Sequence, residues 1–200
     1  MGRLVEAEFP TIVWTPCASH RLDLLMEDIG KLAWVKRVVK KAKSIVTFFT
    51  TKLKVLEMFR THSPLELRKP SSTRFAYIWL PLERIYEVRS ALRQTVVSTL
   101  WNEWDDHDTD DARAMQRLCL QEAFWRQVRA IVIAVTPFYR VLRMSDCEGS
   151  TMGLLVHFFR GAIAEVRACD VITESQCADI LGLAEKRGKW MRKPIHGFAA

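Results

Sequence analysis

The chain has 200 residues, of which 49% are hydrophobic and 26% charged, and its net charge is +7. These values fit one globular domain, or one domain with a tail, and exclude wholesale disorder, a collagen-like repeat and a disulfide framework. Because the sequence has neither a long apolar run nor an N-terminal apolar signal, we expect neither a membrane span nor secretion. Composition predicts a soluble intracellular protein and no particular activity.

Helical patterns dominate, with one exception near the N-terminus. We expect a short helix over 2–9, ended by Pro10, and then the best strand candidate, Thr11–Trp14, whose β-branched and aromatic residues favour extended structure. A single strand cannot form a stable sheet, so this segment is expected to be unpaired or packed against helices. A helix over 20–29 should follow it.

The most regular helical pattern runs over Trp34–Phe49. Its apolar residues recur at the spacing of one buried helix face. They are Val35, Val38, Val39, Ala42, Ile45, Val46 and Phe49. The basic residues occupy the other positions and should reach solvent, because a helix that buries one stripe exposes the rest. They are Lys36, Arg37, Lys40, Lys41 and Lys43.

The remaining helices complete a mainly α fold, which we expect to be a helical bundle with one short strand. They are predicted over 53–60, from 73 to about 96, over 124–144 and 152–169, and from Thr173 to about Lys186. Thr173 and Gln176 form a capping-box pattern at the start of the last helix. The acidic run 105–111 has no apolar anchor, so we expect a solvated loop there.

Charge is distributed unevenly along the chain. Residues 31–93 hold fifteen Lys and Arg against four Asp and Glu, a net charge of +11, whereas residues 94–111 carry a net charge of −6. A basic block of this size is typical of a surface that binds a polyanion. The alternative interpretation is a solvated, Lys-rich helical face without a ligand.

Cys17 and His20 form the sharpest local pattern, with the spacing Cys-x-x-His. A zinc ion would need two more ligands, and the other histidines form no second pair with a cysteine. A Cys–His nucleophile pair would need an orienting third group, which the sequence does not show. We therefore expect a structural cysteine, a hydrogen-bonding histidine, and no metal or cofactor. Five cysteines at wide spacings predict reduced thiols.

One long segment resembles a known family. Residues 14–31 read WTPCASHRLDLLMEDIGK, which is similar to the Cys-x-x-His segment of plant hAT-superfamily transposase-like proteins, with Cys17 and His20 at the motif positions. Residues 34–43 continue the likeness. Two further blocks follow in the family's order: Thr73-Arg74-Phe75-Ala76, and residues 186–196, which resemble a block ending in Pro-Leu-His-Ala. The sequence departs from the family at Pro81 and Gly188.

The resemblance implies a remnant of an RNase H-like fold. Transposases of this kind use three acids to hold divalent metal, and none of those acids maps onto a residue of this chain. We therefore expect no enzymatic activity. Residues 1–33 would be a remnant of the RNase H-like core with the Cys-x-x-His segment, and residues 34–200 a helical insertion-type region.

Three functional hypotheses remain open. The first is a catalytically inactive hAT transposase-derived fragment with weak non-specific DNA binding, nuclear by family resemblance and otherwise cytoplasmic. Its candidate contacts are Lys36, Arg37, Lys40, Lys41, Lys43 and Arg74. The second is a helical protein-interaction module, with related transposase-like chains as partners. The third is a non-functional gene fragment that barely folds. None of the three involves a membrane.

Overall fold

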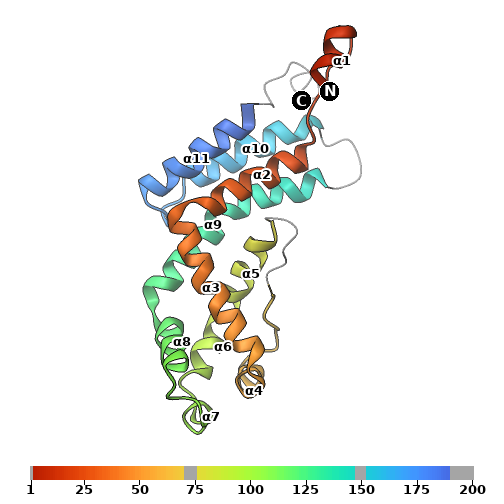
Figure 1. Ribbon diagram of the computed structural model, residues 1–200. Helices are drawn as coiled ribbons and strands as arrows, with labels where there is room; N and C mark the ends of the chain where they lie inside the picture. The colour runs from red at the N-terminus through yellow and green to blue at the C-terminus, as the bar shows by residue number, and fades with distance from the viewer. Residues whose placement is uncertain (1, 70–75, 147–151, 190–200) are drawn as a thin grey trace. The chain divides into compact units, whose positions relative to one another are not determined.

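The computed structural model describes residues 2–69, 76–146 and 152–189, and all regular structure in these ranges is helical (Figure 1). The mainly α prediction is therefore confirmed. The helices are α1 (Gly2–Glu8), α2 (Ala18–Lys31), α3 (Ala33–Thr51), α4 (Leu53–His62), α5 (Ala76–Glu87), α6 (Arg89–Thr95), α7 (Thr99–Asn102), α8 (Asp110–Leu120), α9 (Glu122–Ser145), α10 (Met152–Arg167) and α11 (Glu174–Gly188). Within the described ranges, no helix combines the length and the apolar character needed to cross a bilayer.

The strand predicted at Thr11–Trp14 does not form. Residues 12–17 are neither helix, turn nor strand, and the described part of the chain offers them no strand partner. The side chains of Ile12, Val13 and Trp14 are between 40% and 46% exposed. The prediction of a short strand is therefore wrong for the physical reason that a lone strand cannot satisfy its backbone groups in a sheet. The Trp14 N–H donates to the Glu6 carboxylate of α1 at 2.9 Å, so the segment contacts a helix and not another strand.

The chain divides into two compact units, with boundaries after residues 29 and 132. One unit combines residues 1–29 with 133–200, and the other spans residues 30–132. Helix α2 belongs with the C-terminal helices because its buried face packs in their unit. Helix α9 contributes its first half to one unit and its second half to the other.

In the unit formed by both ends of the chain, contacts connect α2, the second half of α9, α10 and α11. The hydroxyls of Ser19 and Ser145 lie 3.0 Å apart and join α2 to the end of α9. Arg187 of α11 donates to the Asp28 carboxylate of α2 at 2.6 Å. Both partners of this ion pair are mostly buried, so it fastens two helices that are distant in sequence.

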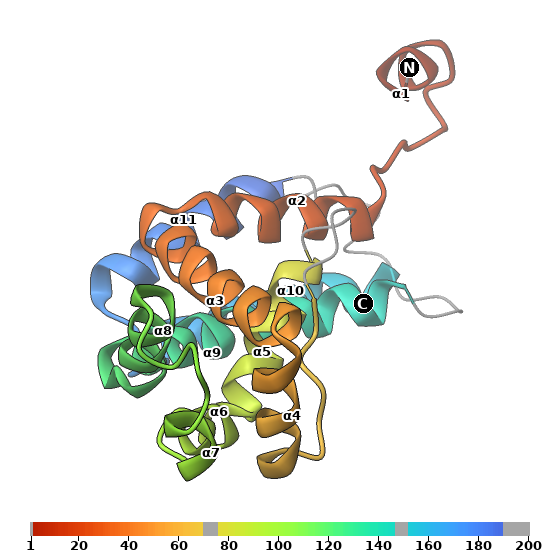
Figure 2. The same ribbon diagram turned by 60° about the horizontal axis from the view of Figure 1, so that its bottom comes forward.

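The unit of residues 30–132 is built around α3, which packs against α4, α5 and α8 (Figure 2). Its core contains a cluster of aromatic side chains: Phe48, Phe49, Phe59, Trp101 and Trp104. Neighbouring rings in this cluster lie 5.5 to 6.3 Å apart in edge-to-face or tilted arrangements. Such pairs add to the free energy gained from burying their apolar area.

The loop in the acidic run 105–111 is shorter than predicted. Residues 105–109 form exposed or half-buried turns, but Asp110 and Asp111 are the first two residues of α8. The Thr109 side chain caps this helix by accepting a hydrogen bond from the Ala112 backbone N–H. Acidic residues stabilise the first turn of a helix because they face the positive end of its dipole. The helix therefore extends into the charged run.

Three glycines in α10 and α11 lead to a stability prediction. A methyl group at Gly161 or Gly182 meets no heavy atom within 4 Å, so Gly161→Ala and Gly182→Ala should each stabilise the unit by up to about 1 kcal/mol. At Gly188 the new methyl would lie 2.7 Å from Cε1 of the buried Phe159 ring, so Gly188→Ala should destabilise by about 1 kcal/mol or more. Urea unfolding followed by circular dichroism tests whether the free energy of unfolding rises in the first two variants and falls in Gly188→Ala.

Candidate nucleic-acid interface

The candidate interface is the solvent-facing side of α3, and the buried side of the same helix determines its orientation. All seven apolar residues of the predicted stripe are buried, and Phe48 joins them. Ile45 and Phe49 are fully buried. The predicted direction of this helix is confirmed, because an apolar stripe held by α4, α5 and α8 leaves the basic positions in solvent.

Five basic side chains form what we call the α3 cationic face: Lys36, Arg37, Lys40, Lys41 and Lys43. All five are exposed, and α3 contains no acidic residue. At about 100° per residue, Lys36, Lys40 and Lys43 fall within about 60° of arc and span about 10 Å along the axis. Arg37 and Lys41 flank this row on one side. The face therefore presents a row of three charges with two beside it.

The basic residues of the α3 cationic face differ from other basic residues of the same unit because they are not paired with acidic side chains. Within the described residues, none of its five members makes an ion pair. Elsewhere, Lys54 pairs with Asp105, Arg60 with Glu66, Arg93 with Glu122, and Arg84 with Glu87. These four acids thus neutralise cations outside α3, and the α3 charges stay available to an external anion.

Electrostatic interactions elsewhere in this unit are structural. The Arg93 guanidinium donates to the Glu122 carboxylate and lowers the pKa of that carboxyl below its usual range. Lys52 lies 5.4 Å from the ring centroids of both Phe48 and Trp104, and so covers the aromatic cluster. Burial raises the pKa of the Cys119 thiol to about 12. A neutral buried thiol of this kind is not a nucleophile.

Several predicted site residues lie outside the described part of the chain. The candidate DNA-binding residue Arg74 and the Thr73 and Phe75 motif positions belong to residues 70–75, and most of the block 186–196 is also outside. Cys17 and His20 are described: Cys17 directly precedes α2, His20 lies in its first turn, and both side chains are exposed. In the described ranges, no three His, Cys, Asp or Glu side chains are grouped as metal ligands.

We predict that Cys17 and His20 do not bind zinc in stoichiometric amounts, because two exposed ligands leave half of a tetrahedral shell unfilled. Elemental analysis of protein purified without chelator should find far less than one zinc per chain. Cys17→Ser should leave that content unchanged, and a stoichiometric ion that disappears in this variant would contradict the prediction.

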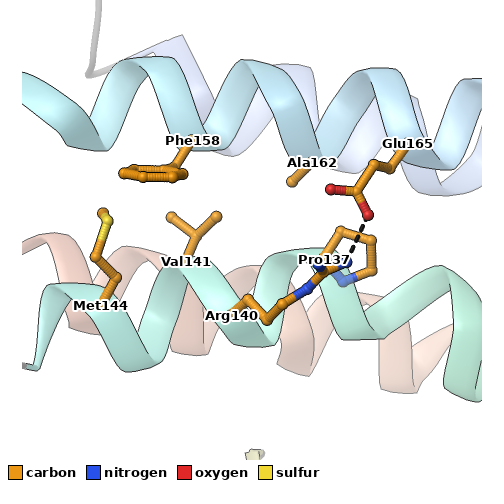
Figure 3. Close-up of a pocket in the computed structure, with 7 residues that line it drawn as sticks. All are labelled: Pro137, Arg140, Val141, Met144, Phe158, Ala162 and Glu165. Carbon is orange, nitrogen blue, oxygen red and sulfur yellow. Dashed lines mark hydrogen bonds and ion pairs between the residues drawn. The ribbon is translucent and has the colours of Figure 1, made fainter.

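Sequence reasoning missed a shallow pocket between α9 and α10. Its volume is about 340 Å³, and Figure 3 shows Val141, Met144 and Phe158 facing one another across it. Arg140 and Glu165 bridge the two helices at one end by an ion pair. Pro137 and Ala162 complete the lining. The lining has no nucleophile, and its two charged groups neutralise each other, so the pocket suits an apolar contact better than a reaction.

The N-terminal part of the chain matches a known family. Residues 1–45 match the family described as "Domain of unknown function (DUF659)", a domain found in hAT-like transposase-related proteins. The matched range includes α1, α2, the Cys-x-x-His motif and the whole α3 cationic face. No curated protein and no solved structure matches the chain.

Proposed function

We propose that this chain is a catalytically inactive, hAT transposase-derived fragment that binds duplex DNA weakly and without sequence preference through the α3 cationic face. The observation that carries the proposal is the exposure of five basic side chains on one helix, none of them committed to an ion pair in the described residues. Such a surface attracts phosphates by releasing counterions, and it reads no base edges.

The match over residues 1–45 supports the family part of this proposal, because the matched segment contains the motif on which the resemblance rests. The plant hAT assignment, the RNase H-like ancestry and a nuclear location belong to the same proposal. Catalytic inactivity rests on the sequence comparison, in which no family acid maps onto this chain.

Salt titration of DNA binding tests the proposed function. Fluorescence anisotropy with two unrelated duplexes of equal length should give equal affinities, with dissociation constants of about 10⁻⁴ to 10⁻⁶ M at physiological salt. The slope of log K against log salt should lie between about −3 and −5, nearly one unit for each neutralised phosphate. Binding that ignores salt, or that prefers one duplex strongly, would contradict the proposal.

A separate assay tests inactivity. Supercoiled plasmid incubated with the protein and Mg²⁺ or Mn²⁺ should show no nicking or strand transfer above the rate without protein. Metal-dependent nicking that persists in Asp23→Asn, Glu27→Gln and Asp28→Asn variants would show that the chain contains a site that the family comparison does not predict. Asp28 pairs with Arg187, so the folding of that variant needs a circular dichroism control.

A further inference from the structure

A second shallow pocket, which we call the α4–α7 pocket, lies within the unit of residues 30–132. It has a volume of about 380 Å³ and is formed by α4 and α7, which Figures 1 and 2 draw side by side. The buried Met58 and Trp104 and the 48% exposed Leu100 supply its apolar surface. A volume at the low end of ligand pockets, open to solvent, suits one large side chain of a partner.

The polar part of this pocket is acidic. Glu57 of α4 and Glu103, the residue after α7, line it and are exposed. Within the described residues, neither makes an ion pair. Lys54, also in the lining, pairs with Asp105 at 3.4 Å, and Lys52 is engaged by two rings of the aromatic cluster. The two glutamates therefore carry the negative charge that the lining leaves unneutralised.

We propose that the α4–α7 pocket docks a short basic segment of another protein. One large apolar side chain of that segment occupies the pocket, and the Lys or Arg side chains beside it pair with Glu57 and Glu103. Burial of the apolar side chain supplies affinity, and the two carboxylates select a cationic sequence. The acidic run 105–111 adjoins Glu103 and contains no basic residue, so it attracts the same partners.

Two other occupants suit the pocket less well. A second copy of the chain, docked by its α3 cationic face, would bring charge without an apolar anchor, because the apolar stripe of α3 is buried in its own core. DNA or an anionic membrane would bring phosphates close to Glu57 and Glu103, and like charges repel at such distances. The partner must therefore combine a cation and an exposed apolar side chain in one segment.

Fluorescence anisotropy of a labelled peptide, titrated with the full chain, tests the docking. The probe is a short acetylated peptide with one leucine between two pairs of lysines, and we expect saturable binding that weakens with salt. Serine in place of the leucine should weaken binding by about tenfold, because the apolar anchor is lost. Glutamate in place of the lysines should abolish binding, because it meets the pocket with like charges.

Variants of the chain locate the binding surface. Glu57→Gln combined with Glu103→Gln should weaken peptide binding by about three- to tenfold, since each exposed ion pair contributes modestly. Leu100→Ala removes apolar surface and should weaken binding without a change of charge. Asp179→Asn combined with Glu185→Gln changes the charge equally at exposed acids of the other unit and should leave the affinity unchanged. Circular dichroism of each variant verifies folding.

Three results would overturn the proposal. The first is equal affinity of the wild type and the double glutamate variant, and the second is equal binding of the leucine and serine peptides. The third is self-association of the chain that disappears in the double glutamate variant, which would assign the pocket to a second copy. The double glutamate variant should keep the wild-type salt slope for duplex DNA, so this proposal and the proposed function succeed or fail separately.

Discussion

Replacement of Lys36, Lys40 and Lys43 by Gln lowers the salt slope of duplex binding by up to about three units, nearly one for each phosphate that the variant no longer neutralises. This is the expected result because the three side chains form one exposed row of the α3 cationic face, and none is held by an ion pair in the described residues. Salt titration of the variant beside the wild type measures the change. Affinity at low salt should fall most, since counterion release contributes most there.

A matched variant separates the position of the charges from their number. Arg160, Arg167 and Lys186 are exposed basic residues of the other unit, and changing all three to Gln lowers the net charge by the same amount. This control should retain most of the wild-type slope. Equal decreases in the two variants would mean that DNA responds to net charge alone, and the α3 cationic face would have no special role.

Folding should be almost unaffected by the α3 variant. Exposed charges contribute little to stability, so the free energy of unfolding should change by less than about 0.5 kcal/mol. If the triple variant were strongly destabilised, and its folded molecules still gave the wild-type salt slope, the basic side chains would have a structural role. That result would remove the main physical support for DNA binding.

The part of the fold that sequence predicts well is the part governed by local periodicity. In α3 the buried positions follow from apolar spacing alone, because one stripe must face the core whatever it packs against. The capping box of Thr173 and Gln176 is another local signal, and both of its hydrogen bonds are present. The exposed side of α3, and with it the candidate site, could therefore be predicted without knowledge of the tertiary fold.

Features that depend on partners distant in sequence could not be predicted in this way. The ion pair of Asp28 with Arg187 joins residues 159 positions apart, and nothing local in either helix indicates it. The pocket in Figure 3 likewise exists only because α10 packs on the second half of α9. Thr11–Trp14 shows the converse, since its strand propensity is real but a strand forms only with a partner.

Substitution of Phe49 by Ala should destabilise the unit of residues 30–132 by about 3–5 kcal/mol, the usual cost of removing a fully buried aromatic side chain. Phe49 has no exposed surface and meets the rings of Phe48 and Phe59 edge-on at centroid distances of 6.0 Å. Alanine would leave a cavity that the surrounding rings cannot fill. Urea unfolding followed by circular dichroism measures the destabilisation, and Leu53→Ala, at a 76% exposed side chain, should cost less than about 0.5 kcal/mol.

The Phe49 variant also completes the test of α3 as a helix with two separate roles. Under conditions where Phe49→Ala is still folded, its duplex binding should keep the wild-type salt slope, because the α3 cationic face is unchanged. The triple Lys variant should show the reverse, with altered binding and normal stability. If Phe49→Ala lowered the salt slope while circular dichroism showed an intact fold, the buried and exposed sides of α3 would be coupled. The binding surface would then depend on core packing more than on the charges themselves.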